Sequence, residues 1–535
     1  MKKSLFILGA TTLLLACGSS KESTKKTVVK TTPIDVTEFA KTITSAELKD
    51  MLYTYASDEF QGRETGEQGH ETAVNYIKDF YIKENITPLQ ANGNYFQDVK
   101  FKQQFTPEIK FLINDKTLNA FEDYVSLNSA SDAQINTQEI IYVGYGIDDE
   151  NYNDYKNIDV KGKIVIAKTG EPKKNDETYV VSGSTEKSKW SSNGRTARSF
   201  KRDAAKANGA SSFLIVDDAA FNFYSSIFKS RAESNSPLGL ALISNANDDE
   251  SNEMLYMIIK EEVVKLLDEN LLSSDAPKTI TSTISLEQKS NSKPLSSKNV
   301  AAVVKGSEFP DEYIIISAHS DHVGVNDNGE VFNGADDDGS GSMAVLEIAE
   351  AFKTAAEKGQ APKRSIIFLH VTGEEKGLLG SQYYTDIEPL VPLANTVANL
   401  NIDMIGRIDP KREGDRNYLY LIGSDKLSTE LHNLSEEVNK KYTNIEFDYT
   451  YNDENDPNRF YYRSDHYNFA KNNVPIIFYF NGTHDDYHKV TDTPDKIEYD
   501  LLENRTRLVF YTAWELANRP NRIVVDKAVD KTAGN

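Results

Sequence analysis

The second half of the chain alternates short apolar strands with helical segments, and this alternation limits the possible folds more than any other feature. Between residues 298 and 520 the pattern predicts strands at 313–317, 366–371, 397–402, 418–422 and 475–480. Helices are predicted at 342–356, 426–440, 465–472 and 501–517. Such alternation is typical of a mostly parallel sheet covered on both faces by helices. We therefore predict a three-layer α/β domain, in which ligands bind beyond the carboxyl ends of the strands.

Potential metal ligands follow these strands at the points where the strands end. They are His319, Asp321, His322, Asp336, Asp337, Asp338, Glu374, Glu375, Asp403, His484 and His488. Because the carboxyl ends of parallel strands meet at one edge of a sheet, all of these side chains can converge. So many carboxylates would repel one another unless cations neutralised them, and divalent ions bind carboxylate oxygen and imidazole nitrogen. The pattern predicts two ions about 3.5–4 Å apart, bridged by a carboxylate.

Five motifs in this order resemble the co-catalytic zinc peptidases. They are His-x-Asp at 319–321, Gly-Ala-Asp-Asp-x-x-Ser-Gly at 334–341, Gly-Glu-Glu-x-Gly at 373–377, Asp-Met at 403–404 and Tyr-His-x-x-x-Asp at 487–492. That family includes the bacterial secreted leucyl aminopeptidases, with glutamate carboxypeptidase II as a distant relative. The resemblance covers about residues 45–130 and 290–518. It implies an enzyme that hydrolyses peptide bonds at a chain end.

The resemblance implies two Zn²⁺ per chain and a role for each matching residue. His319 and Asp403 would bind one zinc, Glu375 and His488 would bind the other, and Asp337 would bridge the two. The nucleophile would be a hydroxide held between the ions. The family also has a cis peptide bond after its bridging aspartate, so we expect one between residues 337 and 338.

Four further residues match catalytic or supporting positions of the family. Glu374 would be the general base, which takes a proton and later gives it to the leaving amine. Asp321 would orient His319 through its carboxylate. Tyr487 would donate a hydrogen bond to the oxyanion, and Arg463 would hold a carbonyl or carboxylate of the substrate.

Some of these residues allow other interpretations. His484 could replace His488 as the ligand, because the two are only four residues apart. Asp492 could orient His488 or cap a turn. We expect structural or supporting roles for His322, His370 and His466, and a structural role for the glycine-containing segment at 60–63.

Residues 135–287 differ from the rest of the chain in sequence pattern, since they carry no cluster of potential metal ligands. They resemble the protease-associated domain that many of these peptidases carry as an insertion. The matching segments are 143–146, 159–163 and 207–210. We predict a lipoprotein signal peptide at 1–16, followed by a lipidated cysteine and flexible linker at 17–42. The catalytic domain is predicted at 43–134 and 288–520, with the inserted β-rich α/β domain at 135–287 between its two parts. Residues 521–535 are predicted to be a C-terminal tail.

The amino-terminal segment is typical of a bacterial lipoprotein. Two lysines precede an apolar run at 5–16, which is shorter than the ~20 residues of a membrane-spanning helix. The run ends at Cys17, the one cysteine of the chain, in a context that resembles the lipoprotein cleavage box. We therefore expect a lipid on Cys17 and a place in the bacterial cell envelope, on the periplasmic or the outer face.

The composition excludes several classes of protein. The 535 residues contain 60 Lys and Arg against 82 Asp and Glu, which gives a net charge of -22. Nucleic-acid binding needs a positive surface, and a single cysteine excludes a disulfide framework, an iron–sulfur cluster or a thiolate zinc site. The expected partners are a peptide substrate and, through the lipid, a membrane.

Four functions fit the sequence. An aminopeptidase agrees best with the motifs, and a carboxypeptidase or dipeptidase could use the same metal site. A glutaminyl cyclase relative would lack the His-x-Asp pair that this chain has at 319 and 321. A non-catalytic receptor on the same fold would have lost ligands, whereas here the five ligands and the base are present.

Overall fold

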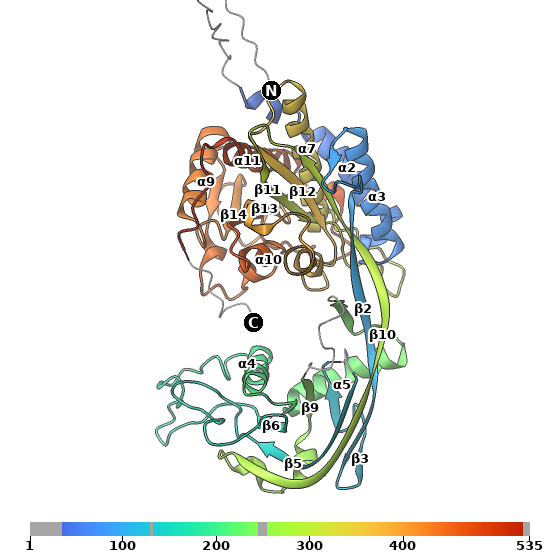
Figure 1. The fold of residues 1–535 in the computed structure, drawn as a ribbon, viewed down its shortest axis with the longest axis vertical. Helices are drawn as coiled ribbons and strands as arrows, with labels where there is room; N and C mark the ends of the chain where they lie inside the picture. Colours follow the sequence, from blue (N-terminus) through green and yellow to red (C-terminus); the bar gives the residue numbers. More distant parts are fainter. Residues whose placement is uncertain (1–34, 129–131, 244–253, 528–535) are drawn as a thin grey trace, which may run out of the picture.

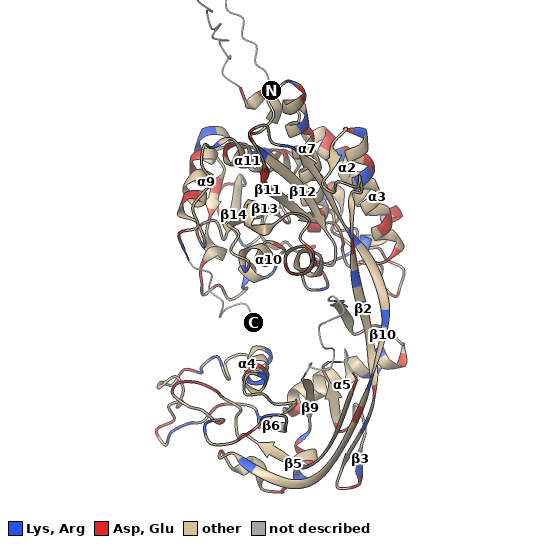
Figure 2. Cartoon of the chain, viewed as in Figure 1, with Lys and Arg blue, Asp and Glu red and all other residues tan. Residues whose placement is uncertain are grey.

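Two long strands run through most of the length of the molecule and join its two lobes (Figure 1). They are β2 (Phe96–Ile113) and β10 (Lys278–Val304), which pair antiparallel. The computed structural model describes residues 35–128, 132–243 and 254–527. We call the described residues between 114 and 277 the small lobe, and those at 35–95 and 305–527 the large lobe. Charged side chains of both signs are spread over both lobes (Figure 2).

The centre of the large lobe is a parallel sheet, as predicted. Its strands are β11 (Phe309–His319), β12 (Arg364–Val371), β13 (Thr396–Ile402) and β16 (Ile476–Phe480), in the order β16-β13-β11-β12. The flanking strands β10 and β14 (Tyr418–Ile422) pair antiparallel with this block, and β15 (Glu446–Asp448) forms the edge. The α/β fold class is therefore confirmed, with a sheet that is parallel where the candidate site lies and mixed elsewhere.

Helices cover both faces of this sheet, which explains why most residues of its strands are buried and apolar. Alternate residues of a strand point to opposite faces. Ile314 and Ile316 pack in the core beneath α7 (Gly341–Glu357) and α11 (Tyr499–Asn518), whereas Ile315 packs on the other face with residues of α10 (His466–Ala470). The helix α9 (Thr429–Tyr442) begins after Ser428, whose side chain accepts a hydrogen bond from the main chain of Leu431.

The folded part begins earlier than predicted. The predicted linker extended to residue 42, but α1 (Thr37–Ala40) already packs Phe39 and Ala40 into the core of the large lobe. The segment at 17–42 contains many polar residues, so its few apolar side chains, which pack against the large lobe, gave no recognisable pattern in the sequence. The helices α2 (Ser45–Tyr55) and α3 (Gln68–Lys83) follow.

Helix α7 carries a buried carboxyl group whose removal should stabilise the protein at neutral and higher pH. Burial, together with the carboxylates of Glu47 and Glu350, raises the pKa of Glu347 to about 8 from its usual 4.5. An acid with a raised pKa in the folded state favours folding while it is protonated. That contribution is present below pH 4.5 and is lost as the pH rises through 8.

We therefore expect Glu347→Gln to raise the free energy of unfolding by about 2 kcal/mol at pH 8 and to change it little at pH 4.5. Glutamine keeps an acceptor for the main-chain N–H of Thr44, which lies 3.3 Å from Glu347 Oε2. Thermal unfolding at the two pH values measures the effect. Glu357→Gln, at an exposed position of the same helix, is the control. Equal stability of Glu347→Gln and the wild type at pH 8 would contradict the assignment.

The small lobe extends the sheet with β5 (Ala133–Tyr142), β6 (Ile164–Lys168), β7 (Ser212–Val216), β9 (Leu255–Ile259) and β4 (Tyr124–Ser126). Its main helices are α4 (Gly194–Ala207) and α5 (Asp218–Glu233), and it has apolar cores of its own. The strand β10 crosses the predicted boundary at 287 without interruption, and the assignment to the protease-associated class stays a prediction.

The predicted signal peptide and Cys17 lie outside the described residues, as do residues 528–535 of the predicted tail. Within the described ranges, every helix is too short or too polar to span a membrane.

Candidate metal centre

The five predicted ligands meet at the carboxyl edge of the parallel strands, around Asp337. His319, at the end of β11, places Nε2 3.1 Å from Asp337 Oδ1 and 3.8 Å from Asp403 Oδ1. His488 places Nε2 3.0 Å from Asp337 Oδ2 and 3.1 Å from Glu375 Oε2. Asp337 therefore lies between two half-sites, as a bridging carboxylate must. The cis peptide bond expected between residues 337 and 338 is also present.

The polar atoms of this centre are better placed to bind metal ions than to hydrogen-bond to one another. Among the described residues, His319 Nε2, Asp337 Oδ2, Glu375 Oε1 and His488 Nε2 are buried and make no hydrogen bond despite their close approach. Buried polar atoms left in this way cost about 1–3 kcal/mol each, so such clusters call for a ligand. Imidazole nitrogen with carboxylate oxygen is a donor set that zinc accepts. The residues present therefore fit two ions that share Asp337.

The carboxylates of Asp337 and Glu375 are both held ionised. Burial would raise the pKa of Asp337, but the contacts with His319 and His488 outweigh it and keep that pKa well below its usual range. Burial and the charge of Asp337 would likewise raise the pKa of Glu375, but His322 and His488 lower it to about 2. Ionised oxygens are the form in which carboxylates bind metals.

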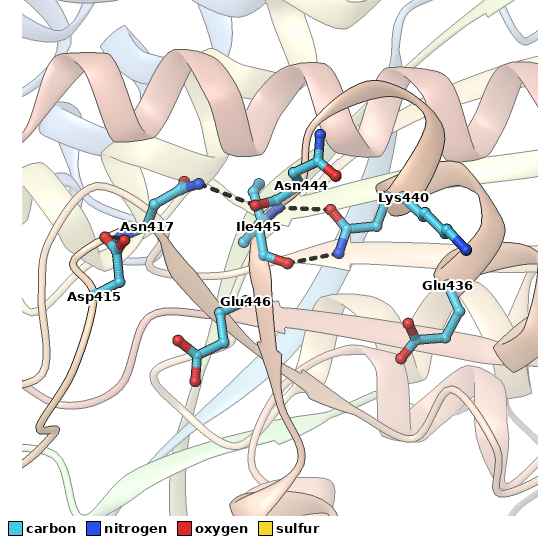
Figure 3. A pocket seen from close by; sticks show the side chains of 8 residues that line it. Asp415, Asn417, Glu436, Lys440, Asn444, Ile445 and Glu446 are labelled. Atoms are coloured by element: carbon cyan, nitrogen blue, oxygen red, sulfur yellow. Dashed lines mark hydrogen bonds between the residues drawn. The ribbon is translucent and has the colours of Figure 1, made fainter.

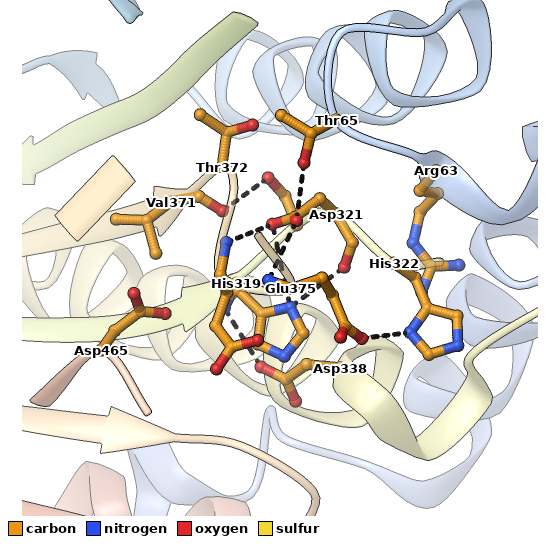
Figure 4. A network of polar contacts seen from close by, with 12 residues as sticks. Arg63, Thr65, His319, Asp321, His322, Asp338, Val371, Thr372, Glu375 and Asp465 are labelled. Atoms are coloured by element: carbon orange, nitrogen blue, oxygen red, sulfur yellow. Dashed lines mark hydrogen bonds and ion pairs between the residues drawn. The ribbon is translucent and has the colours of Figure 1, made fainter. Parts of the chain in front are cut away.

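His322 lies among the ligand atoms, where we expected a structural or supporting histidine. Its buried ring places Nδ1 2.9 Å from Glu375 Oε1 and 3.9 Å from Asp337 Oδ2 (Figure 4). His322, Asp337 and Glu375 together form one of two groups of described residues that could hold an ion; His319, Asp337 and Asp403 form the other. The feature of the sequence that could have indicated this role is the position of His322, three residues after His319 in the same turn at the end of the strand.

The predicted role of Asp321 needs a correction. Nδ1 of His319 lies 3.0 Å from the main-chain carbonyl of Asp321 and 4.0 Å from its carboxylate. The carboxylate instead accepts hydrogen bonds from the main-chain N–H groups of Glu374 and Glu375 and from the hydroxyl of Thr65 (Figure 4). The tight turn after β11 brings the carbonyl closer to the ring. Asp321 therefore fixes the Glu374–Glu375 turn, while its backbone orients His319.

Asp403 is oriented by a chain of polar side chains that the sequence did not reveal. Ser464 donates to Asp403 Oδ2 at 2.6 Å and accepts from Asn401 at 2.9 Å. Asn401 in turn accepts from Ser317 at 2.7 Å. All of these residues are buried, so the chain fixes which oxygen of Asp403 faces His319.

Removing the hydroxyl of Ser464 should therefore weaken metal binding without removing a ligand. We expect Ser464→Ala to lower the affinity for zinc by about 10–100-fold, because supporting hydrogen bonds contribute on that scale. Competition against a chromophoric chelator measures the affinity. Ser230→Ala, at an exposed position of α5, is the control. An unchanged affinity would mean that Asp403 does not depend on this hydrogen bond.

Asp336 and Asp338 hold the loop that carries Asp337. Asp338 accepts from the main-chain N–H of His319 at 3.2 Å and of Met404 at 3.2 Å, and so ties β11 to the turn after β13. Asp336 accepts from the main chain of Gly406 and faces His484 at 3.2 Å. His484 therefore lies against Asp336, whereas His488 lies among the ligand atoms.

Asp492 orients this loop rather than His488. Its carboxylate accepts from the main-chain N–H groups of Asp336 and Asp337, at 3.0 and 3.3 Å. His370 contacts the hydroxyl of Tyr81 and His466 contacts the carbonyl of Tyr461, both away from the ligand cluster, as expected of structural histidines.

The segment at 60–63 has the structural role that we expected, and that role supports the metal centre. The guanidinium of Arg63 is buried and donates to the carbonyls of Asn333 and Gly334, at 2.7 and 2.9 Å. Gly62 has φ +62°, and a Cβ atom there would lie 2.2 Å from the carbonyl oxygen of Gly324. Only glycine fits at that position.

A small pocket opens onto the ligands, and we call it the central pocket. Its lining includes Asp337, Asp403, Glu374, Tyr487 and Arg463, so it brings the predicted base, oxyanion donor and substrate-binding arginine together. Burial raises the pKa of Glu374 well above its usual value; His319 opposes the shift, and the neighbouring carboxylates add to it. Glu374 is therefore an unusually strong proton acceptor for a carboxylate.

Tyr487 remains protonated and can donate a hydrogen bond. Burial and the charges of Asp337 and Glu375 raise its pKa far above the ordinary value for a phenol. Its ring stacks on that of His488 with the centroids 3.9 Å apart, which fixes its position next to the ligand.

Another pocket, of about 310 Å³, contains none of the predicted site residues (Figure 3). Its lining includes Asn439, whose side chain binds both the N–H and the carbonyl of Ile445 at 2.8 and 2.6 Å. This arrangement closes the turn after α9, so the pocket is a consequence of local folding.

The cluster of histidines and carboxylates at the strand ends of this α/β sheet is a candidate metal-binding site. Residues 299–513 match the model of Peptidase family M28.

The chain is also similar to several characterised or named proteins. It is 24% identical over 365 residues to the probable leucine aminopeptidase 2 of Aspergillus oryzae, covering 68% of this chain and 58% of the relative. It is 38% identical over 110 residues to the aminopeptidase NAALADL1 of Mus musculus, covering 20% of this chain and 14% of that protein. Thus the chain spans less than two thirds of the length of these relatives. Among solved structures, the aminopeptidase from Aneurinibacillus sp. strain AM-1 is 19% identical, with 92% and 98% of the two chains covered and a TM-score of 0.49.

Proposed function

We propose that the protein is a zinc-dependent exopeptidase, an aminopeptidase that removes N-terminal residues from peptides with two Zn²⁺ per chain. The observation that carries this proposal is the pair of half-sites sharing Asp337, with Glu374 in the same pocket but outside both ligand groups. A carboxylate next to two metal sites, and not itself among the candidate ligands, is what a general base requires.

When bound, the two ions would supply Lewis acidity and an activated water. The side chains of the central pocket transfer the proton and stabilise the developing charge. Glu374 accepts the proton of the attacking water and passes it to the leaving amine. Tyr487 donates to the oxygen of the attacked carbonyl as charge develops there. Asp321 fixes the backbone of Glu374, so the base stays aligned with the substrate.

One observation supports cleavage at the amino end. A relative that matches over 68% of the chain is named as a probable leucine aminopeptidase.

Two observations support the alternative, a carboxypeptidase or dipeptidase. Arg463 lines the same pocket and could pair with the carboxylate of a C-terminus. A probable glutamate carboxypeptidase of Arabidopsis thaliana is 34% identical to the chain over 106 residues.

Mass spectrometry of the products from one peptide separates these possibilities. The peptide is offered with free ends, with an acetylated N-terminus and with an amidated C-terminus, each with and without a chelator. An aminopeptidase gives a ladder from the N-terminus that acetylation and the chelator both stop. A ladder from the C-terminus would overturn the assigned end, and cleavage that survives the chelator would overturn the metal dependence.

We also propose that the protein is a lipoprotein of the bacterial cell envelope. The apolar run at 5–16 and the single cysteine at position 17 support this. Cys17→Ser should move the protein from the membrane fraction to the aqueous fraction, and an unchanged distribution would contradict the lipid anchor.

A further inference from the structure

A cavity of about 640 Å³ lies between the two lobes. One wall comes from the large lobe, mainly from residues 451–471, and includes Tyr451, Tyr461 and Tyr462. The other wall comes from α4 of the small lobe and includes Thr196 and Phe200. In Figure 1, α4 lies on the side of the small lobe that faces the large lobe. A cavity of this size is in the range that proteins use to bind ligands.

The cavity and the central pocket share one wall, the single-turn helix η8 (Phe460–Tyr462) and its neighbours. Phe460 and Arg463 line the central pocket, whereas Arg459, Tyr461 and Tyr462 line the cavity. A 3₁₀ helix has three residues per turn, so adjacent side chains point in different directions. The two spaces therefore adjoin along one short backbone segment, around which a bound peptide would pass.

Their sizes differ by more than a factor of ten. The central pocket encloses about 30 Å³ and the cavity about 640 Å³. A peptide with one residue at the metal centre must therefore leave most of its length outside the central pocket. The neighbouring cavity is a space of sufficient size for that length.

We propose that this cavity binds the part of a peptide substrate that follows the residue being removed, so that peptides of several residues are better substrates than dipeptides or aminoacyl amides. The inference rests on the function proposed above and adds the class of substrate. It also gives the small lobe a role, because α4 supplies a wall that only a longer peptide reaches.

The chemistry of the lining suits a peptide of mixed composition. Tyrosine side chains offer large faces against which the chain of a peptide can pack. Lys426 and Lys471 lie in the same lining as Asp453 and Glu454, so the cavity favours neither polyanions nor polycations. Binding energy gained at a distance from the scissile bond can be used to raise the rate of the chemical step.

The first arm of the test is a series of substrates with one N-terminal residue: an aminoacyl amide, a dipeptide, a tripeptide, a hexapeptide and a nonapeptide. We expect kcat/KM to rise by about tenfold or more between the amide and the longest peptides. Equal kcat/KM values across the series would overturn the proposal.

The second arm uses a substitution that fills part of the cavity. The substitution lies in the small lobe, away from the predicted catalytic residues. Thr196→Arg places a long side chain on α4, and arginine is a good helix former. This variant should remove the gain from peptide length and leave hydrolysis of the amide unchanged. Thr196→Ser and Thr54→Arg, the latter at an exposed position of α2, should both behave as the wild type. An equal loss on the amide and on the nonapeptide would overturn the proposal.

A third arm keeps this inference separate from the proposed function. Fluorescence anisotropy measures binding of a nonapeptide labelled at its C-terminus to the full chain with Glu374→Gln, with and without Thr196→Arg. Weaker binding with Thr196→Arg supports the cavity, even if the wild type hydrolyses none of the substrates and the aminopeptidase function fails. Equal binding overturns the cavity, even if every substrate is hydrolysed.

Discussion

Replacing Glu374 with glutamine is expected to lower kcat about 10³-fold while two metal ions remain bound to each chain. Glutamine has the size of glutamate, and the main-chain N–H of residue 374 would keep its hydrogen bond to Asp321. What is lost is a carboxylate that can accept a proton in the central pocket. Because Glu374 belongs to neither of the two candidate ligand groups, the ligands themselves stay intact.

Turnover of an N-terminally free peptide and metal content by elemental analysis test this expectation together. Glu357→Gln, at an exposed position of α7, controls for the removal of a charge. Loss of metal along with activity would mean that Glu374 is a ligand and that the roles of Glu374 and Glu375 are exchanged. A variant that remains fully active would remove Glu374 from the mechanism.

Replacing Asp337 with asparagine should affect both half-sites at once. Its two carboxylate oxygens face His319 on one side and His488 on the other, at 3.1 and 3.0 Å. Asparagine offers one carbonyl oxygen and no charge, so neither half-site keeps an anionic bridge. We expect the affinity for zinc to fall by about 100-fold or more and kcat/KM to fall by about 10⁴-fold.

Isothermal titration with zinc measures this loss independently of activity. Asp485→Asn lies in the same loop as His488 but is exposed, and it should bind zinc as the wild type does. If Asp337→Asn still bound two ions with the affinity of the wild type, Asp337 would not be the bridge. Circular dichroism of the metal-free protein would check that the fold is retained.

The sequence predicted the central strands well because both faces of those strands are buried. Residues such as Ile314, Ile315 and Ile316 are apolar in succession, which is the pattern of a parallel strand between two helix layers. The long strands β2 and β10 were missed. Their polar residues, many Lys, Ser and Gln, lie on partly exposed faces, so the apolar signal is diluted.

The ligands were predictable because they lie in the segments that follow the strand ends, where the fold places binding residues. The residues that support them were harder to predict. Ser464 contacts Asp403 across 61 positions of sequence, and Arg63 reaches Gly334 across 271. Contacts between residues so far apart in the chain cannot be predicted from a local sequence pattern. The role of Asp321 depended on a turn geometry in which the carbonyl, not the carboxylate, is nearer to His319.

The central claim is that these residues hold two metal ions around Asp337, and native mass spectrometry of the zinc-loaded full chain tests it most directly. The account predicts a mass increase of two zinc ions per chain, falling to none after a chelator and returning when zinc is restored. A chain that takes up one ion or none under saturating zinc would contradict it.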